Sequence, residues 1–144
     1  MALTQIDLTL ELREISLKDR PPQLHDISPK ETVPVLYLQN GEVIDESLDI
    51  MLWCFHQNGW QSEYSSKLEL IKIIDGDFKY WLDRYKYYER YPKYSRDYYR
   101  DKCAAILSQF EKLLEKNPYF SGNKMQLADM AIFPFIRQFA HVEK

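Results

Sequence analysis

The spacing of apolar and polar positions changes along the 144-residue chain. Near the start, every second residue from Leu8 to Leu12 is a leucine with polar residues between, and this period of two predicts a half-buried strand. A weaker signal predicts a short helix over residues 23–27. From residue 67 onward, apolar side chains recur at helical spacing. The pattern therefore predicts a first part of mixed strand and helix and a second part of helices alone.

A further strand signal surrounds an Asn-Gly pair. The run 33–38 is rich in Val, Leu and Tyr, Asn40 and Gly41 follow it, and residues 42–44 form a second short run. Asn-Gly between two such runs predicts a β-hairpin with a type I′ turn, which needs a positive φ at both central residues. Pro34 stands at the beginning of the first run, where a missing backbone donor is tolerated.

A helix is expected directly after the hairpin. Asp45, Glu46 and Ser47 predict its beginning, because acidic and hydroxyl side chains suit the free N–H groups of a first helical turn. Asn58 and Gly59 predict its end. The expected apolar face of this helix consists of Leu48, Met51, Leu52 and Phe55.

Three more helices are expected after a polar linker at residues 61–66. The first carries an apolar stripe over residues 68–85, and the second carries one over residues 103–114. The last, over about residues 127–139, is apolar on nearly every side, which is typical of a helix in the middle of a bundle. Pro134 inside it removes a backbone donor and predicts a kink.

Composition narrows the classes of function. With 45% hydrophobic and 28% charged residues, the chain has the balance of a globular domain. A net charge of −3 provides no global basic field for nucleic acid or anionic lipid, and no apolar run is long enough for a membrane helix. The four isolated glycines form no phosphate-binding loop, and the three scattered histidines indicate no metal site. Two cysteines without CxxC spacing fit a reducing, cytoplasmic location.

Several motifs, in their order and spacing, resemble those of the glutathione S-transferase family. They are Val33-Pro34-Val35-Leu36, then Asp45-Glu46-Ser47, then Gly122 with Leu127-Ala128-Asp129. The segment from Leu12 to Pro21 is similar to the second strand and following loop of omega-like and related bacterial branches. The resemblance covers nearly the whole chain. It implies an α/β unit of thioredoxin-like type over residues 1–60, then the linker, then an all-helical domain over residues 67–144.

The resemblance also implies a glutathione site in the N-terminal unit. Pro34 matches the family's cis-proline, whose bend presents the backbone of Val33 to the cysteinyl part of glutathione like an added strand. Glu46 and Ser47 match the pair that holds the γ-glutamyl end, Glu46 toward the ligand's ammonium group and Ser47 at a helix N-terminus that attracts a carboxylate. Arg20 matches a basic position that holds the glycyl carboxylate in related branches.

Each of these residues also has a purely structural interpretation. Pro34 can simply shape the entrance of the hairpin, Glu46 and Ser47 can cap a helix and do nothing more, and Arg20 can be a solvated loop charge. Asp129 resembles the family's buried capping acid and is interpreted as structural.

The beginning of the chain departs from the family pattern. Members of this branch begin with a strand and a loop that carries the activating Cys, Ser or Tyr, and a parallel crossover needs a dozen or more residues. Because few residues precede Leu8, we expect the first strand and most of the first helix to be absent, and the helical domain to be shortened at its other end. The Leu8 strand must then pair with a second chain, move next to the hairpin, or lose its strand form. Cys54 and Cys103 are expected to be small buried hydrophobes, so the catalytic residue stays unassigned.

Three functions follow as hypotheses. The first is a glutathione S-transferase family protein with glutathione as co-substrate, ancestrally transferring or conjugating it to an electrophile or mixed disulfide, with weak or no activity in this chain. The second is a non-enzymatic, homodimeric interaction module with the same fold. The third is single-strand nucleic-acid binding by the tyrosines and seven Lys/Arg of residues 80–102, which is disfavoured because four Asp/Glu share that segment.

Overall fold

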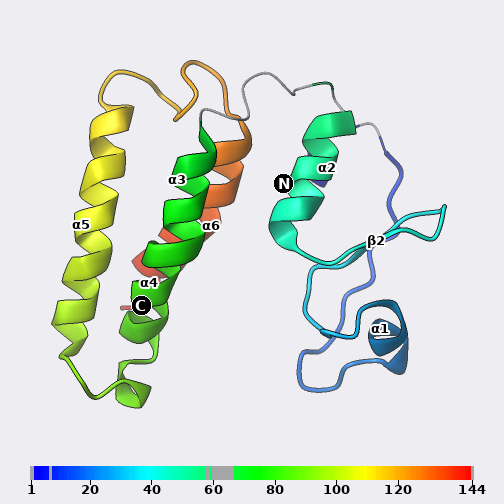
Figure 1. Ribbon diagram of the computed structural model, residues 1–144, viewed down its shortest axis with the longest axis horizontal. Coiled ribbons are helices and arrows are strands. Elements are labelled where there is room, and N and C mark those ends of the chain that lie inside the picture. Colours follow the sequence, from blue (N-terminus) through cyan, green and yellow to red (C-terminus); the bar gives the residue numbers. More distant parts are fainter. Residues whose placement is uncertain (1, 7, 58, 60–66, 144) are drawn as a thin grey trace. The chain divides into compact units, whose positions relative to one another are not determined.

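The computed structural model describes residues 2–6, 8–57, 59 and 67–143. It divides the chain into two compact units, Met1–Gln61 and Ser62–Lys144, whose elements are shown in Figure 1. The predicted linker at residues 61–66 lies outside the described residues. Each unit is therefore considered by itself.

The first unit is built around a short hairpin and the helix that follows it (Figure 1). Leu36 pairs with Ile44 and Tyr37 with Val43 in an antiparallel two-stranded sheet. In chain order the elements are η1 (Leu3–Gln5), α1 (Pro22–Ile27), β1 (Leu36–Tyr37), β2 (Val43–Ile44) and α2 (Ser47–Gln57).

The buried side chains of this unit come from one face of α2, from Leu36 of β1 and from Ala2, and α2 packs against η1. That face is rotated from the predicted one: Phe55 is buried as expected, but Ile50 and Cys54 are buried with it. The other three members of the predicted face, Leu48, Met51 and Leu52, are only partly buried.

The hairpin forms as predicted, but its turn differs from type I′. The carbonyl of Leu38 accepts from the N–H of Gly41 at 3.0 Å, and the Leu38 N–H donates to the carbonyl of Glu42 at 2.9 Å. The loop therefore has three residues. Gly41 has a φ of 88°, whereas Asn40 keeps an ordinary negative φ. A three-residue loop needs only one left-handed residue, which glycine supplies without steric cost.

The predicted strand over Leu8 to Leu12 is wrong. Residues 8–15 form neither strand nor helix, and Leu8, Leu10 and Leu12 are 44%, 41% and 83% exposed. A strand needs a partner for its backbone groups, and the sheet within the described ranges contains only β1 and β2. Of the three outcomes expected for this segment, the loss of strand form is the one observed.

The second unit is helical, as predicted. The helical stretch that begins at Leu68 continues to Lys86 through a π-helical turn that contains Gly76. α5 packs against α4, and α6 packs against α3 and α4 (Figure 1). In chain order the elements are α3 (Leu68–Ile73), η3 (Ile74–Phe78), α4 (Lys79–Lys86), η4 (Tyr88–Arg90), α5 (Arg96–Leu114) and α6 (Leu127–Ala140).

The core of the second unit follows the predicted apolar stripes, except at the end of α5, where Leu113 is 45% exposed, and near the end of α6. In the first turns of α6, every residue from Leu127 to Ile132 except Asp129 is buried, whereas Phe133 is 53% exposed and Pro134 lies inside the helix at the surface. Asp129 accepts hydrogen bonds from the backbone N–H groups of Gln126 and Phe120, both at 3.0 Å. It therefore caps α6 and ties the preceding loop to it. Within the described ranges, no helix is both long and apolar enough to cross a membrane.

Replacement of Gly41 by alanine tests the turn. We expect Gly41→Ala to lower the free energy of unfolding by roughly 1 kcal/mol, because a side chain disfavours a φ near 88°. Gly76→Ala is the matched control, since a Cβ added there meets no atom within 4 Å and φ is not positive. It is expected to be neutral or to stabilise by up to about 1 kcal/mol. Urea denaturation measures both, and equal effects would contradict the left-handed conformation of Gly41.

Candidate functional site

The predicted site residues of the first unit lie on two neighbouring stretches. Ser47 is the first residue of α2, and Glu46 precedes it directly. Val33 and Pro34 lie just ahead of β1, and the peptide bond between them is cis. The structure brings the loop that leads to Val33 into contact with the beginning of α2, through side chains described below.

Val33 combines an exposed side of the chain with backbone groups that, among the described residues, have no backbone partner. In the part of the chain that the structure describes, its N–H and C=O pair with no other backbone group. The residue is 45% exposed, and regular pairing in the hairpin begins only at Leu36. Exposed and unpaired backbone groups are what an extended peptide needs if it is to bind like an added strand.

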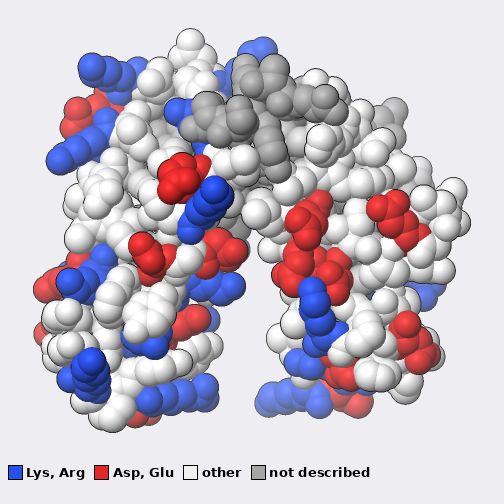
Figure 2. Space-filling view, viewed as in Figure 1, with Lys and Arg blue, Asp and Glu red and all other residues white. Residues whose placement is uncertain are grey.

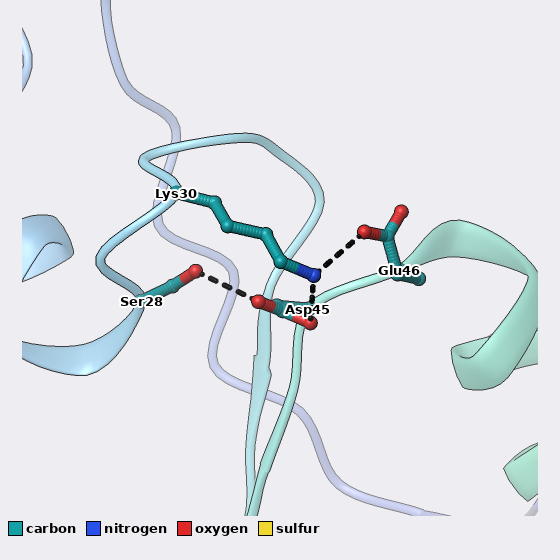
Figure 3. A network of polar contacts seen from close by, with 4 residues as sticks. All are labelled: Ser28, Lys30, Asp45 and Glu46. Atoms are coloured by element: carbon teal, nitrogen blue, oxygen red, sulfur yellow. Dashed lines mark hydrogen bonds and ion pairs between the residues drawn. The ribbon is translucent and has the colours of Figure 1, made fainter.

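A network of four side chains holds the beginning of α2 (Figure 3). The Lys30 Nζ lies 2.9 Å from Oε1 of Glu46 and 3.4 Å from Oδ1 of Asp45. The Ser28 hydroxyl, 1% exposed, donates to Oδ2 of Asp45 at 3.1 Å. The hydrogen bonds to Glu46 and then Asp45 raise the pKa of Lys30, so its ammonium form is favoured. The two carboxylates thus join the loop at residues 28–30 to the helix.

Arg20 already has a carboxylate partner. Its Nη1 lies 3.5 Å from Oε2 of Glu31, and Nδ1 of His25 lies 2.9 Å from Oε1 of the same side chain. Glu31 has a φ of 51°, which is uncommon for a residue other than glycine. A ligand carboxylate at Arg20 would therefore compete with Glu31.

Sequence reasoning missed Ser28 and Lys30. They are separated from their partners Asp45 and Glu46 by 15 to 17 positions, and no helical or strand period connects them. The available signal was the pair of adjacent carboxylates after the hairpin, since such a pair is stabilised by a nearby cation or donor. Which lysine or serine supplies it depends on the path of the loop.

Neither cysteine is prepared for nucleophilic catalysis. Cys54 and Cys103 are 1% and 0% exposed and form no disulfide. Burial raises the pKa of both thiols, that of Cys103 to about 12. The thiolate is the reactive form of cysteine, and a raised pKa keeps both thiols protonated and unreactive. Both side chains therefore belong to the core. This agrees with their expected role as small buried hydrophobes.

Comparison with known proteins identifies the family. The family model described as the N-terminal domain of glutathione S-transferase matches residues 1–62, and that described as the C-terminal domain matches residues 73–144. The chain therefore belongs to the glutathione S-transferase family. No curated protein sequence matches it.

Solved structures with the same fold include three from this family. BphK, a bacterial glutathione S-transferase in a ternary complex, aligns with a TM-score of 0.80 and 22% identity over 99% of this chain and 77% of its own. A family member from Pseudomonas fluorescens with two glutathione bound aligns with a TM-score of 0.77 and 19% identity, over 99% of this chain and 71% of its own. A glutathione transferase from Burkholderia graminis with two glutathione molecules per subunit aligns with a TM-score of 0.68 and 18% identity, over 85% of this chain and 58% of its own.

The family assignment confirms the predicted fold class, an α/β unit of thioredoxin-like type followed by an all-helical domain. At these identities the structural likeness establishes the fold. The roles of Arg20, Val33, Pro34, Glu46 and Ser47 remain predictions.

The buried thiols make a testable prediction about reactivity. Near pH 9, the ordinary pKa of a thiol, we expect Cys103 in the folded chain to be alkylated by iodoacetamide at least about tenfold more slowly than in concentrated urea, because its pKa is about 12. The Cys54→Ala variant isolates Cys103 for this measurement. Equal rates in the folded and unfolded chain would show that Cys103 is accessible and ionised.

Proposed function

We propose that this chain binds glutathione on its N-terminal unit, beside Pro34, and that Val33, Glu46, Ser47 and Arg20 contact it. The observation that carries the proposal is the backbone of Val33, an exposed residue without a backbone partner in the described ranges. Side-chain contacts join its loop to the beginning of a helix that carries a carboxylate and a hydroxyl. Two of the structural relatives have glutathione bound, which supports the same ligand class.

The chemistry of each part of glutathione matches one feature. The cysteinyl backbone pairs with Val33 as a short added strand. The γ-glutamyl carboxylate binds at the free N–H groups of the first turn of α2, beside Ser47. The γ-glutamyl ammonium binds Glu46, and the glycyl carboxylate binds Arg20 in exchange for Glu31.

Lys30 gives this site an internal competitor. Its ammonium group forms an ion pair with the Glu46 carboxylate, to which the ligand's ammonium is proposed to bind. On binding, Lys30 gives up Glu46 and keeps Asp45, to which it is also bonded. The exchange costs affinity, because one ion pair is broken for each one formed.

The reaction class is attack of the glutathione thiolate on an electrophile or a mixed disulfide, with glutathione as co-substrate. We propose that these 144 residues catalyse it weakly or not at all. The resemblance assigns the family's activating Cys, Ser or Tyr to no residue of this sequence, and both cysteines are buried with raised pKa values. Two unpaired thiols also fit a cytoplasmic location. Conjugation and thiol-transfer assays test this, and turnover well above the uncatalysed rate would refute it.

Charge variants test glutathione binding. By isothermal titration calorimetry, we expect Glu46→Gln to weaken binding roughly three- to tenfold, because it removes the ammonium partner, and Lys30→Met to strengthen it roughly threefold, because it removes the competitor.

An exposed pair on α3 provides the matched controls. Glu69→Gln and Lys72→Met make the same changes of charge in a pair that lies 3.8 Å apart on one helix, and both are expected to leave binding unchanged. No binding by the unmodified chain, or equal effects at Glu46 and Glu69, would contradict the proposed site.

A homodimeric interaction module is the second candidate, and one observation favours it. Leu8, Leu10 and Leu12 are exposed in a segment without regular secondary structure, which no strand of the described ranges pairs with. Exposed apolar side chains grouped on one segment are a surface for association with a second chain.

Native mass spectrometry tests the dimer. We expect a dimer of the unmodified chain, loss of the dimer in Leu10→Lys, and its retention in Thr9→Lys, which places the same charge on the neighbouring exposed residue. A monomer at all protein concentrations would eliminate this candidate.

A further inference from the structure

The Glu31 carboxylate, in the loop between α1 and β1, is held from two sides. Its Oε2 lies 3.5 Å from Nη1 of Arg20, and its Oε1 lies 2.9 Å from Nδ1 of His25. Arg20 precedes α1, and His25 lies in the last turn of that helix. One carboxylate therefore joins the segment before α1, the helix itself and the loop after it.

The backbone around Glu31 determines where this carboxylate lies. Glu31 has a φ of 51°, and its N–H donates to the carbonyl of Ser28 at 2.9 Å. A residue other than glycine keeps a left-handed conformation only where surrounding contacts hold it there. The buried Ser28 is itself bonded to Asp45, so the turn that carries Glu31 is anchored to the beginning of α2. This anchored turn presents the carboxylate to Arg20 and His25.

The two partners of Glu31 differ in how their charge depends on pH. An arginine is always charged, whereas a histidine changes its charge between about pH 5 and 8. A carboxylate oxygen can only accept, so Nδ1 of His25 carries a proton in this contact, and the ring gains its charge at Nε2. The His25 side chain is 65% exposed, so this proton exchanges with solvent.

We propose that Glu31 gates Arg20 and that the charge of His25 sets this gate, an inference that rests on the proposed glutathione site. When His25 is neutral, Arg20 is the one cation paired with Glu31 among the described residues, and the glycyl carboxylate has to displace Glu31 from it. When His25 is protonated, the imidazolium neutralises Glu31, and Arg20 turns to the ligand at a lower cost. His25 and Glu31 are thus positioning residues for Arg20.

The direction of the pH dependence follows from this exchange. Binding of the glycyl carboxylate withdraws Arg20 from Glu31 and adds a negative charge near His25, and both changes favour the charged ring. Protonation and ligand binding therefore strengthen each other by the same factor. Glutathione affinity is expected to rise as the pH falls through the range in which histidine titrates, with net uptake of protons on binding.

Other charged groups near His25 keep their charge over this range. Asp26 follows His25 on α1, and Lys30 precedes Glu31 but is bonded to Glu46 and Asp45. Carboxylates and ammonium groups stay charged between about pH 5.5 and 8. Figure 2 shows acidic and basic residues interspersed over the visible face, without a large patch of one sign. The expected pH dependence is therefore local to His25.

Calorimetric titration of the full chain with glutathione at about pH 5.5 and about pH 8 tests the gate. We expect the unmodified chain to bind roughly threefold more tightly at the lower pH, and His25→Gln to bind at both with the weaker affinity. Glu31→Gln releases Arg20, so it is expected to bind at both with the tighter affinity. His141→Gln, which removes an exposed histidine of the second unit, is the matched control and keeps the pH dependence.

A second measurement needs no ligand. The ring protons of His25, followed by nuclear magnetic resonance, report its titration directly. We expect Arg20→Gln to raise the proton affinity of the ring roughly twofold, because Glu31 is then no longer neutralised by the guanidinium. Arg13→Gln removes an exposed arginine of the same unit that pairs with Glu11, and is expected to leave the ring unchanged. Circular dichroism verifies that each variant is folded.

The outcomes separate the gate from the glutathione site. Equal affinity of the unmodified chain at both pH values, or a pH dependence that persists in His25→Gln or Glu31→Gln, would overturn the gate and leave the site intact. An unchanged His25 titration in Arg20→Gln would overturn the coupling without reference to any ligand. Absence of glutathione binding at both pH values would refute the proposed site, and the gate with it.

Discussion

The carboxylate of Asp45 is the contact on which the candidate site depends. It accepts from the buried Ser28 hydroxyl and pairs with Lys30, and these bonds join the loop before the cis proline to the beginning of α2. A buried hydroxyl without an acceptor costs roughly 1–3 kcal/mol, so the Ser28 contact constrains both stretches. The neighbouring Glu46 and Ser47 are thereby held beside the segment that leads to Val33. The whole glutathione-binding proposal follows from this juxtaposition.

In the helical unit, the hydroxyl groups of buried tyrosines join separate segments, as the carboxylate of Asp45 does in the first unit. The Tyr85 ring is buried, with its centre 5.5 Å from that of Phe139, while its hydroxyl lies 2.7 Å from a carboxylate oxygen of Glu143. Burial, and then the hydrogen bond to Glu143, raises the pKa of this phenol, so it stays protonated and donates. Tyr99 likewise combines a buried ring with a hydroxyl that donates to the carbonyl of Tyr91, in the segment between η4 and α5. The tyrosine-rich sequence thus supplies both the core and the polar contacts between segments, because each ring is apolar and each tip is polar.

Local sequence signals predicted the elements that depend on local physics. The Asn40-Gly41 pair marked the hairpin, the acidic and hydroxyl residues at 45–47 marked the beginning of α2, and the helical period after residue 67 marked the second unit. The failures have a common cause. The Leu8 to Leu12 alternation lacked a partner strand, and the turn used one left-handed residue where two were expected. Period and turn propensity describe a segment, but strand pairing and register need a second segment.

The sequence by itself determined the hairpin, the helix that follows it, the helices of the second unit, and the resemblance to the glutathione S-transferase family. Capping, periodicity and motif spacing are properties of neighbouring residues, so they can be read without the tertiary structure. Only the tertiary structure decided that Lys30 pairs with Glu46, that Glu31 pairs with Arg20, and that His25 contacts the same carboxylate as Arg20. These contacts join residues that no period relates, through loops whose path depends on the packing of the whole unit. Charge partners were therefore beyond the reach of sequence patterns, although every partner was visible in the sequence.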